Sequence, residues 1–361
     1  MQTRILFITK SRLSFSRAYS INIVRTAEAL AATGQSEVTV LSSAKEQESA
    51  ERILLHKGAR PVFTLDVSQR ARSLWYEVVR RRGTFDMIYF RDPFLWHIAL
   101  IARAVFRKRV VFEVHGSHEW RCGWLFWRLS CAVSHGLIFI THPLAAYYKP
   151  QKPYIVTHTH SYDKALFESD ESKNELRSRL GLPLDVPLVM YAGSLLWYSW
   201  EVLVAMIALV PSPALLVLVG VKSDEKEIIL RAVRQADLED RVLIYPRVAP
   251  TVYPSYLRAA DILVNPLRIS YPGSISSKIY EYLAAGRPIV SSLGGANNEV
   301  IVHETNALVA DLSGRAFADA VNRILRDPKL AQHLSQRAQE TVQAFTWEKR
   351  ARDIISLIQR L

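Results

Sequence analysis

Short apolar runs alternate with longer helical patterns through the first half of the chain. Several of these runs are almost continuously apolar, which is typical of strands that are covered on both faces. We predict strands over Arg4–Thr9, Glu37–Leu41, Val62–Leu65, Asp86–Phe90, Arg109–His115 and Gly136–Ile140. Helical patterns lie between them, for example over Tyr19–Ala32 and Leu95–Phe106. This alternation predicts βαβ units and a mainly parallel sheet.

The same alternation starts again after a polar, proline-punctuated stretch between Lys149 and Val186. The strands predicted beyond it are Leu188–Ala192, Leu215–Val219, Val242–Tyr245, Ile262–Asn265, Pro288–Ser291 and Ala307–Val309. We therefore predict an α/β protein with two doubly wound domains of similar size. This fits a length of 361 residues, because a domain averages roughly 150 residues. We place the domains at residues 1–165 and 166–345, followed by a final helix at residues 346–361.

The residues that follow the predicted strand at Ile262–Asn265 have the pattern of a turn and then a helix. Ser276 or Ser277 can cap this helix. Unpaired backbone N–H groups at the start of a helix point at a ligand and favour phosphate. Lys278 adds a positive charge there, and Glu281 follows three residues later. An ordinary helix cap with a surface ion pair also explains these residues.

The stretch from Asp261 to Glu299 resembles the donor-binding segment of glycosyltransferases with the GT-B fold, especially the retaining family 4. The matching residues are Lys278, Glu281, Tyr282, Ala285, Gly286, Pro288, Val290, Gly294, Gly295 and Glu299. The other similar segments are Ala18–Gly34, Val111–Gly116, Val189–Leu195, Ala259–Asn265, Asn306–Asp311 and Phe345–Glu348. The resemblance implies a GT-B architecture, in which two Rossmann-like domains face each other across a cleft and the final helix crosses back to the first domain.

The resemblance also implies roles for individual residues. In the family, the glutamate at the position of Glu281 holds the ribose hydroxyls of a nucleotide, and the histidine at the position of His115 approaches the donor sugar. The catalytic candidates are His115, Glu113 and Lys278. The donor-binding candidates are Glu281, Gly193, Ser194, Val248, Ser274, Ser276 and Ser277.

Three departures from the family pattern concern the donor and its phosphates. Gly273 stands where the family usually has a sugar-contacting glutamate, and residues 194–199 lack the usual Arg and Lys. The loop Lys10–Tyr19, which is usually rich in glycine, contains none. A diphosphate leaving group needs positive charge where its negative charge develops, so we hypothesise that Lys278 and the backbone amides near Ser276 compensate. The candidates for further positive charge, in the first domain, are Lys10, Arg12 and Arg17.

Glu113 and His115 form a second group of candidates at the end of a predicted strand. Residues two apart on a strand project to the same face of the sheet, and ligands bind beyond the carboxyl ends of strands in sheets of this class. The alternative interpretation is a buried histidine that has Glu113 as its structural partner.

The net charge of +12 belongs almost entirely to the first half of the chain. Residues 1–168 contain 24 Lys and Arg against 13 Asp and Glu, whereas the remainder is nearly balanced. Basic and aromatic side chains interleave over residues 70–82, which we predict to be helical, and over residues 120–128. This mixture suits the headgroup region of an anionic membrane, although a solvated basic surface without a partner has the same composition.

Other chemistries lack their motifs in this sequence. There is no Asp-x-Asp motif, no Cys/His set at zinc spacing, no P-loop and no G-x-G-x-x-G. We therefore expect no metal and no cofactor besides a nucleotide-sugar substrate. The chain has two cysteines, no pattern of a signal peptide and no apolar stretch that approaches the ~18 residues of a spanning helix. We expect a cytoplasmic protein that binds peripherally, if at all, to the inner face of the membrane.

The function that these observations favour is the retaining transfer of a hexose-type sugar from a nucleoside diphosphate to a glycan or lipid-linked acceptor. One alternative is a GT-B-like protein without catalysis, which binds a nucleotide sugar or acts as a scaffold. A second is a sugar-nucleotide epimerase of the same architecture. A third is a nucleic-acid-binding protein, but no recognition motif accompanies the basic charge, and we expect no nucleic-acid partner.

Overall fold

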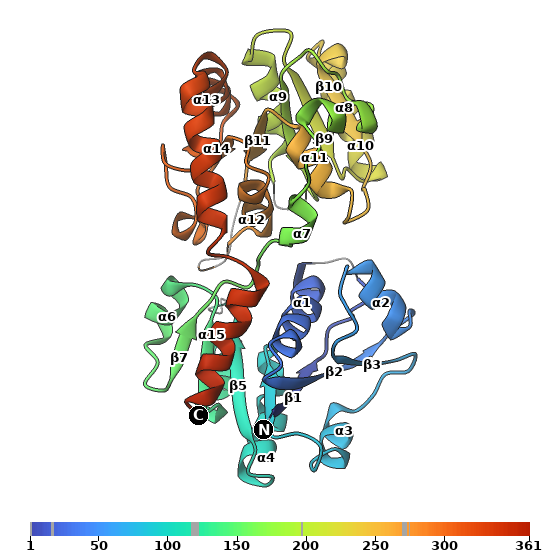
Figure 1. Ribbon diagram of the computed structural model, residues 1–361, viewed down its shortest axis with the longest axis vertical. Coiled ribbons are helices and arrows are strands. Elements are labelled where there is room, and N and C mark those ends of the chain that lie inside the picture. The colour runs from blue at the N-terminus through green and yellow to red at the C-terminus, as the bar shows by residue number, and fades with distance from the viewer. Residues whose placement is uncertain (1, 16–17, 117–122, 196–197, 269–272, 274) are drawn as a thin grey trace. The chain divides into compact units, whose positions relative to one another are not determined.

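The computed structural model describes all residues except 1, 16–17, 117–122, 196–197, 269–272 and 274. The chain divides into two compact units (Figure 1). The first unit comprises residues 1–160, 272–274 and 347–361, and the second comprises residues 161–271 and 275–346. Each unit is built around its own sheet.

The first unit contains a seven-stranded sheet in the order β3-β2-β1-β4-β5-β6-β7, in which neighbouring strands pair in parallel. The strands are β1 (Thr3–Thr9), β2 (Ser36–Lys45), β3 (Thr64–Ser68), β4 (Met87–Phe90), β5 (Arg109–Val114), β6 (Gly136–Phe139) and β7 (Tyr154–Val156). Along β1, Ile5 and Phe7 pack into one apolar cluster, and Leu6 and Ile8 pack into another. Both faces of the sheet are covered, which explains why its strands are almost continuously apolar.

Helices supply the partners of these two clusters. They are α1 (Ala18–Ala32), α2 (Ala50–His56), α3 (Leu74–Arg80), η1 (Pro93–Leu95), α4 (Trp96–Ala104), α5 (Gly123–Val133), α6 (His142–Tyr148) and α15 (Trp347–Gln359). Helix α15 packs beside α1 (Figure 1), and its residues Ile354 and Leu357 join Ile23 of α1 in one apolar cluster. The last helix of the chain is therefore part of the first unit.

The second unit contains a six-stranded parallel sheet in the order β10-β9-β8-β11-β12-β13. The strands are β8 (Leu188–Ala192), β9 (Leu215–Val219), β10 (Val242–Tyr245), β11 (Ile262–Asn265), β12 (Ile289–Ser291) and β13 (Leu308–Val309). The helices are α7 (Lys164–Phe167), α8 (Lys173–Leu180), α9 (Trp200–Leu209), α10 (Ser223–Gln235), η2 (Glu239–Arg241), α11 (Tyr253–Ala259), α12 (Ser277–Ala284), η3 (Asn297–Glu299), α13 (Gly314–Arg326) and α14 (Pro328–Val342). The strand order changes direction between β8 and β11, and ligands of open α/β sheets bind at the carboxyl ends of such strands.

The doubly wound α/β organisation predicted from the sequence is confirmed. The six strands predicted for the second half agree with the observed strands to within one residue. Strand β7 is absent from the prediction, because its three residues directly follow Pro153 in a stretch with the composition of a linker.

The prediction of one helix over residues 70–82 is wrong. Ser73 has extended backbone angles, and its side chain accepts a hydrogen bond from the Tyr76 amide, so α3 begins directly after it. Arg70 and Arg72 therefore precede the helix. The physical reason is the capping preference of serine, which the arginine pattern obscures.

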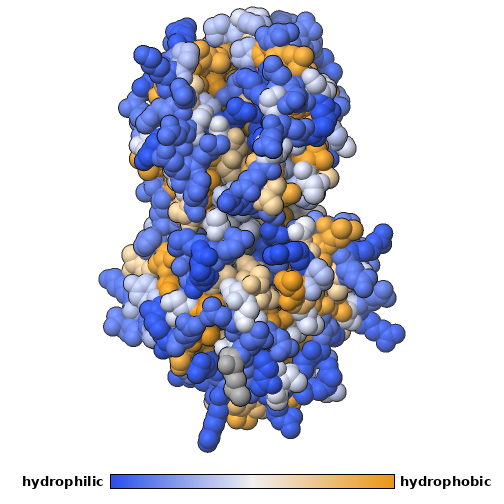
Figure 2. All heavy atoms as spheres, viewed as in Figure 1, coloured by the Kyte–Doolittle hydropathy of each residue, from blue (hydrophilic) through white to orange (hydrophobic). Residues whose placement is uncertain are grey.

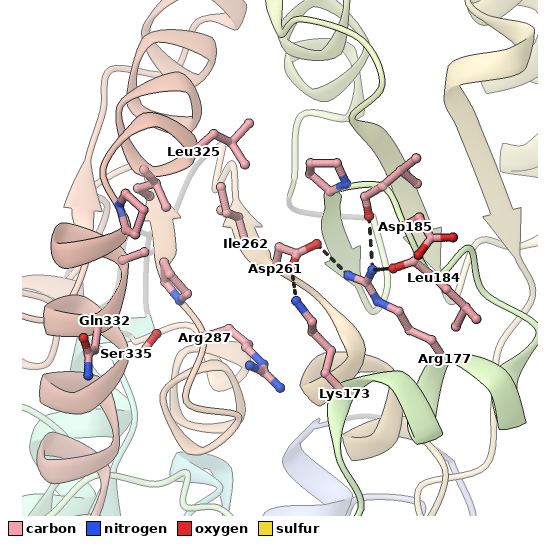
Figure 3. Close-up of a pocket in the computed structure, with 16 residues that line it drawn as sticks. Lys173, Arg177, Leu184, Asp185, Asp261, Ile262, Arg287, Leu325, Gln332 and Ser335 are labelled. Atoms are coloured by element: carbon pink, nitrogen blue, oxygen red, sulfur yellow. Dashed lines mark hydrogen bonds and ion pairs between the residues drawn. The ribbon is translucent and has the colours of Figure 1, made fainter.

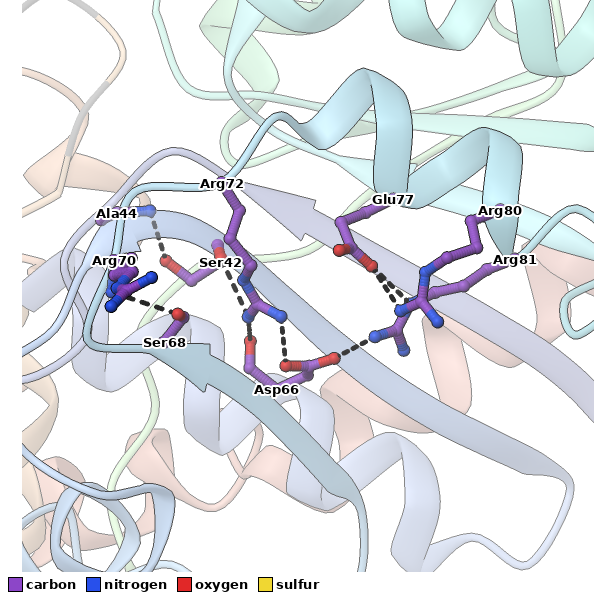
Figure 4. A network of polar contacts seen from close by, with 9 residues as sticks. All are labelled: Ser42, Ala44, Asp66, Ser68, Arg70, Arg72, Glu77, Arg80 and Arg81. Carbon is purple, nitrogen blue, oxygen red and sulfur yellow. Dashed lines mark hydrogen bonds and ion pairs between the residues drawn. The ribbon is translucent and has the colours of Figure 1, made fainter.

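Carboxylates neutralise much of the positive charge in this stretch (Figure 4). Asp66 of β3 pairs with Arg72 at 2.7 Å and also with Arg81. Glu77 of α3 pairs with Arg80 at 2.7 Å and with Arg81 at 3.2 Å. The pKa of Glu77 lies below its ordinary value, chiefly because Arg80 donates a hydrogen bond to it. The network ties α3 to the edge strand β3 and leaves fewer free cations there than the sequence suggests.

A hollow of about 500 Å³ in the second unit lies at the amino ends of β8, β11 and β12 (Figure 3). Asp261 organises it by accepting from Lys173 at 2.5 Å, from Arg177 at 2.5 Å and from the Leu188 amide at 2.7 Å. Arg177 is almost fully buried and also donates to backbone carbonyls. These groups satisfy one another, and this edge is opposite to the one where such sheets bind ligands.

Hydrophilic residues cover most of the face shown in Figure 2, and apolar residues form separate patches between them. No helix in the described part of the chain combines the length and the apolar composition that crossing a membrane requires.

Candidate functional site

Gly193 follows β8 and lies directly against the side chain of Lys278 from α12. Its φ of 119° is in the region that favours glycine. A Cβ added at Gly193 would lie 2.3 Å from Lys278 Cε and 3.0 Å from Nζ. A larger residue at this position would displace the lysine. The glycine thus makes room for a positive charge at the carboxyl end of the central strand.

Lys278 is only 8% exposed. Its Nζ donates to the Ser194 carbonyl at 3.2 Å and lies 3.7 Å from the ring centroid of Tyr198 and 5.2 Å from that of Tyr191. Aromatic faces stabilise an ammonium group in this position. Burial nevertheless lowers the pKa of Lys278 to about 7, and the nearby Glu281 carboxylate opposes this shift only in part. In the described residues, no carboxylate forms a salt bridge with this ammonium group.

Glu281 lies on the next turn of α12 and is partly exposed. Burial raises its pKa to about 7, although Lys278 lowers it. Within the described ranges, no hydrogen bond or salt bridge to its carboxylate is found. The carboxylate is thus available to accept hydrogen bonds from a ligand.

Tyrosines hold the backbone around this pair. The Tyr282 hydroxyl accepts from the Ala192 amide at 2.9 Å, and the Tyr253 hydroxyl donates to the Ala192 carbonyl at 3.1 Å. The Tyr198 hydroxyl lies 2.7 Å from Ser276 Oγ. Except for Tyr282, these tyrosines are absent from the sequence prediction, because their partners lie on other elements and no local spacing signals them.

The structure alters the predicted role of the backbone at Ser276. This residue stands at the N-cap position of α12, but its side chain makes no capping hydrogen bond. Its amide donates to Asn297 Oδ1 at 2.9 Å. The Ser276 amide is therefore already occupied, and Ser277 is the first residue of α12. The sequence hypothesis assigned the compensating positive charge to Lys278 and to the backbone amides near Ser276. Because the Ser276 amide is occupied, Lys278 supplies most of this charge.

Two other residues predicted to bind the donor are Val248 and Ser274. Val248 lies after β10 and packs against apolar residues of the second unit. Ser274 lies outside the described residues.

Glu113 and His115 at the end of β5 belong to a polar network in the first unit. Glu113 is fully buried. One carboxylate oxygen pairs with His115 Nε2 at 2.6 Å, and the other accepts from Arg350 of α15 at 2.8 Å and from the Tyr89 hydroxyl. Burial alone would raise the pKa of Glu113, but Arg350 and His115 outweigh it and lower the pKa. Glu113 is thus an ion-pair partner inside the fold.

The two contacts of the His115 ring define its protonation state. Nδ1 lies 3.0 Å from Arg91 Nη2, and Nε2 lies 2.6 Å from Glu113. Arginine only donates and a carboxylate only accepts, so Nδ1 accepts and Nε2 carries the proton. Burial and Arg91 lower the pKa of His115 to about 4. His115 is therefore a neutral histidine with both nitrogens engaged by protein groups. This is close to the alternative interpretation, in which Glu113 is the structural partner of the histidine.

Arg350 and Arg91 are functional candidates that the sequence interpretation missed. Arg350 is 2% exposed and also donates to the carbonyls of Thr157 and His158. One signal was available: Arg350 lies on the apolar face of α15, between Trp347 and Ile354. A charged residue on such a face requires a buried partner.

In the loop after β1, two backbone amides are already hydrogen-bonded within the protein, so that mainly side chains are available to a ligand. The Leu13 amide donates to the buried Glu46, and Ser14 donates to the same carboxylate through its amide at 3.1 Å and its hydroxyl at 2.6 Å. An internal carboxylate thus occupies these amides. Lys10 Nζ lies 5.8 Å from the Phe94 ring centroid, and the Arg12 guanidinium lies 5.4 Å from that of Phe15. Arg17 lies outside the described residues.

Residues 186–327 match the family described as Glycosyl transferases group 1. This part of the chain is thus similar to the group 1 glycosyltransferases. The overall fold of the chain is the GT-B architecture, since the chain aligns along almost its whole length with glycosyltransferase structures. The predicted resemblance is therefore confirmed at this level, while the assignment to the retaining family 4 stays a prediction.

The chain is similar to a D-inositol 3-phosphate glycosyltransferase of Xylanimonas cellulosilytica, with 30% identity over 50% of this chain and 44% of the relative. The chain spans about half or less of the length of the curated relatives it matches. The Anabaena protein Alr3699/HepE, solved in complex with UDP-glucose, has 18% identity and a TM-score of 0.76 over 100% of both chains. The sucrose-phosphate synthase of Thermosynechococcus elongatus has 20% identity and a TM-score of 0.78 over 99% of both chains. At these identities the structures establish the fold alone.

Proposed function

We propose that this protein transfers a sugar from a nucleoside diphosphate to an acceptor hydroxyl. The observation that carries the proposal is the pair of Lys278 and Glu281, three residues apart on α12, with Lys278 against Gly193 at the carboxyl end of β8. The ammonium group suits a diphosphate, and the unpaired carboxylate suits the two hydroxyls of a ribose. The UDP-glucose complex of the similar Alr3699/HepE supports a uridine nucleotide as the first donor to test.

Within this proposal, the unit transferred is a hexose, the anomeric configuration is retained, and the acceptor is a glycan or a lipid-linked sugar. Lys278 stabilises the charge that develops on the leaving diphosphate. We expect the reaction to need no metal, because Lys278 supplies this charge. Glu113 and His115 then act as positioning residues, since both ring nitrogens of His115 and both oxygens of Glu113 are engaged by protein groups.

The affinity for UDP-glucose should depend on pH with a maximum near pH 7. Donor binding requires a charged Glu281 and a charged Lys278, and burial brings the pKa of each to about 7. As the pH falls below 7, Glu281 gains a proton and the ribose contact weakens. As it rises above 7, Lys278 loses its proton and the phosphate contact weakens. Calorimetric titration with UDP-glucose between pH 5.5 and 8.5 measures this pH profile. On each side of the maximum, the Kd should rise by up to about tenfold per pH unit.

Two variants test which residue causes the loss of affinity on the acidic side and on the alkaline side of the maximum. Glu281→Gln removes the acidic limb and weakens binding by about 10- to 100-fold at pH 7, the effect of a hydrogen bond to a charged group. Lys278→Met removes the alkaline limb. A wild-type affinity that stays constant across the range contradicts the assignment of both residues.

A catalytically inactive nucleotide-sugar-binding protein is the second candidate, and Gly273 favours it. This residue has a φ of 83°, and a Cβ added there would lie 2.6 Å from Leu144 Cγ. The structure therefore has no ready room for the glutamate that the family usually has at this position. Release of UDP from UDP-glucose with a panel of glycan and lipid-linked acceptors separates the candidates, since a binding protein releases none.

We also propose that the first unit binds an anionic membrane surface through α5. Trp124 is 49% exposed and Leu125 is 43% exposed, and the Arg128 guanidinium lies 5.6 Å from the Trp124 ring centroid. Exposed apolar and cationic side chains on one helix suit the headgroup region. The paired arginines of α3 contribute less, because Asp66 and Glu77 neutralise them.

Vesicle co-sedimentation should therefore show stronger binding to vesicles with anionic lipid than to neutral vesicles, and this binding should fall with salt. Trp124→Ser with Arg128→Gln should reduce it at least fivefold. Trp75→Ser is the matched control, since Trp75 is equally exposed but lies on α3. Equal binding to neutral and anionic vesicles removes the electrostatic part of the proposal.

A further inference from the structure

Arg91, which directly follows β4, has no negatively charged partner in the described part of the chain. Its Nη1 donates to Asn22 Oδ1 at 2.5 Å, and its Nη2 donates to His115 Nδ1 at 3.0 Å. The Asn22 amide is oriented by its own hydrogen bond to the Thr159 carbonyl. Both acceptors are neutral. The guanidinium group has five N–H donors, so three of them stay free of any partner found in the described residues.

Two arginines that are more deeply buried than Arg91 differ in this respect. Arg350 pairs with Glu113 at 2.8 Å, and Arg177 pairs with Asp261 at 2.5 Å. A buried charge is costly unless it is paired. This cost lowers the pKa of Arg91 to about 9, chiefly through burial of the guanidinium group and also through the positive charge of Arg350.

The groups around Arg91 do not compensate its charge. The Glu113 carboxylate is already shared by Arg350 and His115. Burial and the neighbouring Arg91 hold His160 neutral and lower its pKa to about 3, as they also do for His115. With two arginines and one carboxylate, the cluster has an excess of one positive charge. This excess positive charge favours the binding of a negatively charged ligand.

The position of Arg91 in the sheet matches a ligand site. Arg91 stands at the carboxyl end of β4, and β4 lies between β1 and β5 in the sheet. Lys10 follows β1 and is exposed, and His115 follows β5. Lys10 Nζ lies over the ring of Phe94, which is three residues beyond Arg91. The carboxyl edge of the first sheet therefore gathers a free guanidinium face, a second cation and neutral histidines, at the edge where such sheets bind ligands.

We propose that Arg91, with added charge from Lys10, binds a phosphate group carried by the acceptor. This assignment rests on the proposed function, which places the donor diphosphate at Lys278 in the second unit. Arginine is suited to phosphate because its planar fork forms two parallel hydrogen bonds. The acceptor would then be a phosphorylated sugar, polyol or lipid headgroup, with the phosphate near the hydroxyl that receives the sugar.

The test is a titration of the full chain with inorganic phosphate and, separately, with glycerol 3-phosphate, followed through the histidine ring signals by NMR at pH 7. His115→Asn and His160→Asn identify the two reporting signals. Both ligands should shift these signals in the wild type. Arg91→Gln should weaken binding about 10- to 100-fold, the effect of losing hydrogen bonds to a charged group. Arg91→Lys, which keeps the charge and loses the fork, should fall between the two.

Arg109→Gln is the matched control, because Arg109 is exposed and begins β5 at the opposite edge of the same sheet. It should bind both ligands like the wild type. Unchanged binding in folded Arg91→Gln and Arg91→Lys overturns the proposal. Binding of inorganic phosphate without binding of glycerol 3-phosphate overturns the assignment to an acceptor.

A parallel titration with UDP-glucose separates this proposal from the proposed function. Arg91→Gln should bind UDP-glucose like the wild type, because the donor site is assigned to the second unit. If the wild type binds glycerol 3-phosphate through Arg91 but binds no nucleotide sugar, the phosphate site stands and the donor assignment fails. If Arg91→Gln loses UDP-glucose as well as glycerol 3-phosphate, the phosphate at Arg91 belongs to the donor and the acceptor assignment fails.

Discussion

The variant Lys278→Ala should lose about 10²-fold or more in turnover number, with a smaller change in stability. This is the scale of removing one group that stabilises developing charge in a transition state. The effect should be large because residues 194–199 provide no Arg or Lys and the Ser276 amide is occupied by Asn297. Steady-state kinetics of UDP release from UDP-glucose, with the acceptor found in the panel, measures it.

The matched control for this prediction is Lys226→Ala, since Lys226 is an exposed lysine of the same unit on α10. It should turn over like the wild type. Lys278→Arg keeps the positive charge but changes its geometry, because the lysine side chain lies directly against Gly193. An effect of less than threefold for Lys278→Ala would show that another group neutralises the leaving diphosphate.

The variant Arg350→Met should lower the free energy of unfolding by about 3–5 kcal/mol, the cost of leaving a buried charge unpaired. Arg350 and Glu113 are 2% and 0% exposed, and the ion pair joins α15 to β5. Urea denaturation followed by circular dichroism measures the loss. The same variant also frees Glu113, so that His115 loses a fixed partner.

The double variant Glu113→Gln with Arg350→Met provides the critical comparison. It removes both charges, so it should be clearly more stable than Arg350→Met alone. Arg352→Met, an exposed arginine on the same helix, should unfold like the wild type. A loss of less than 1 kcal/mol for Arg350→Met would mean that Glu113 finds another partner or a proton.

Local sequence patterns predicted the fold of this protein well. Strands such as Leu188–Ala192 and Ile262–Asn265 are short apolar runs between turn residues, and both were predicted with their observed bounds. The helix with Lys278 and Glu281 was also predicted, because a turn and a serine that can cap a helix precede it in the sequence. The positions of Lys278 and Glu281 after the strand Ile262–Asn265 follow from the order of the helices and strands along the chain.

The polar partners within each unit could not be predicted in this way. Arg350 and Glu113 are 237 residues apart in the sequence, and no periodicity connects them. The Ser276 amide was expected to face a ligand, but a side chain 21 residues away occupies it. Hydrogen-bond partners of this kind depend on three-dimensional packing, whereas a helix or a strand depends mainly on its own residues.

The proposed function depends on a nucleotide site at Lys278 and Glu281. A crystal structure of the full chain with UDP-glucose tests it most directly. The expected result is a diphosphate within hydrogen-bond distance of Lys278 Nζ, with both ribose hydroxyls donating to the Glu281 carboxylate. A nucleotide bound elsewhere, with Lys278 still on the Ser194 carbonyl and Glu281 without a ligand contact, would contradict the proposed function.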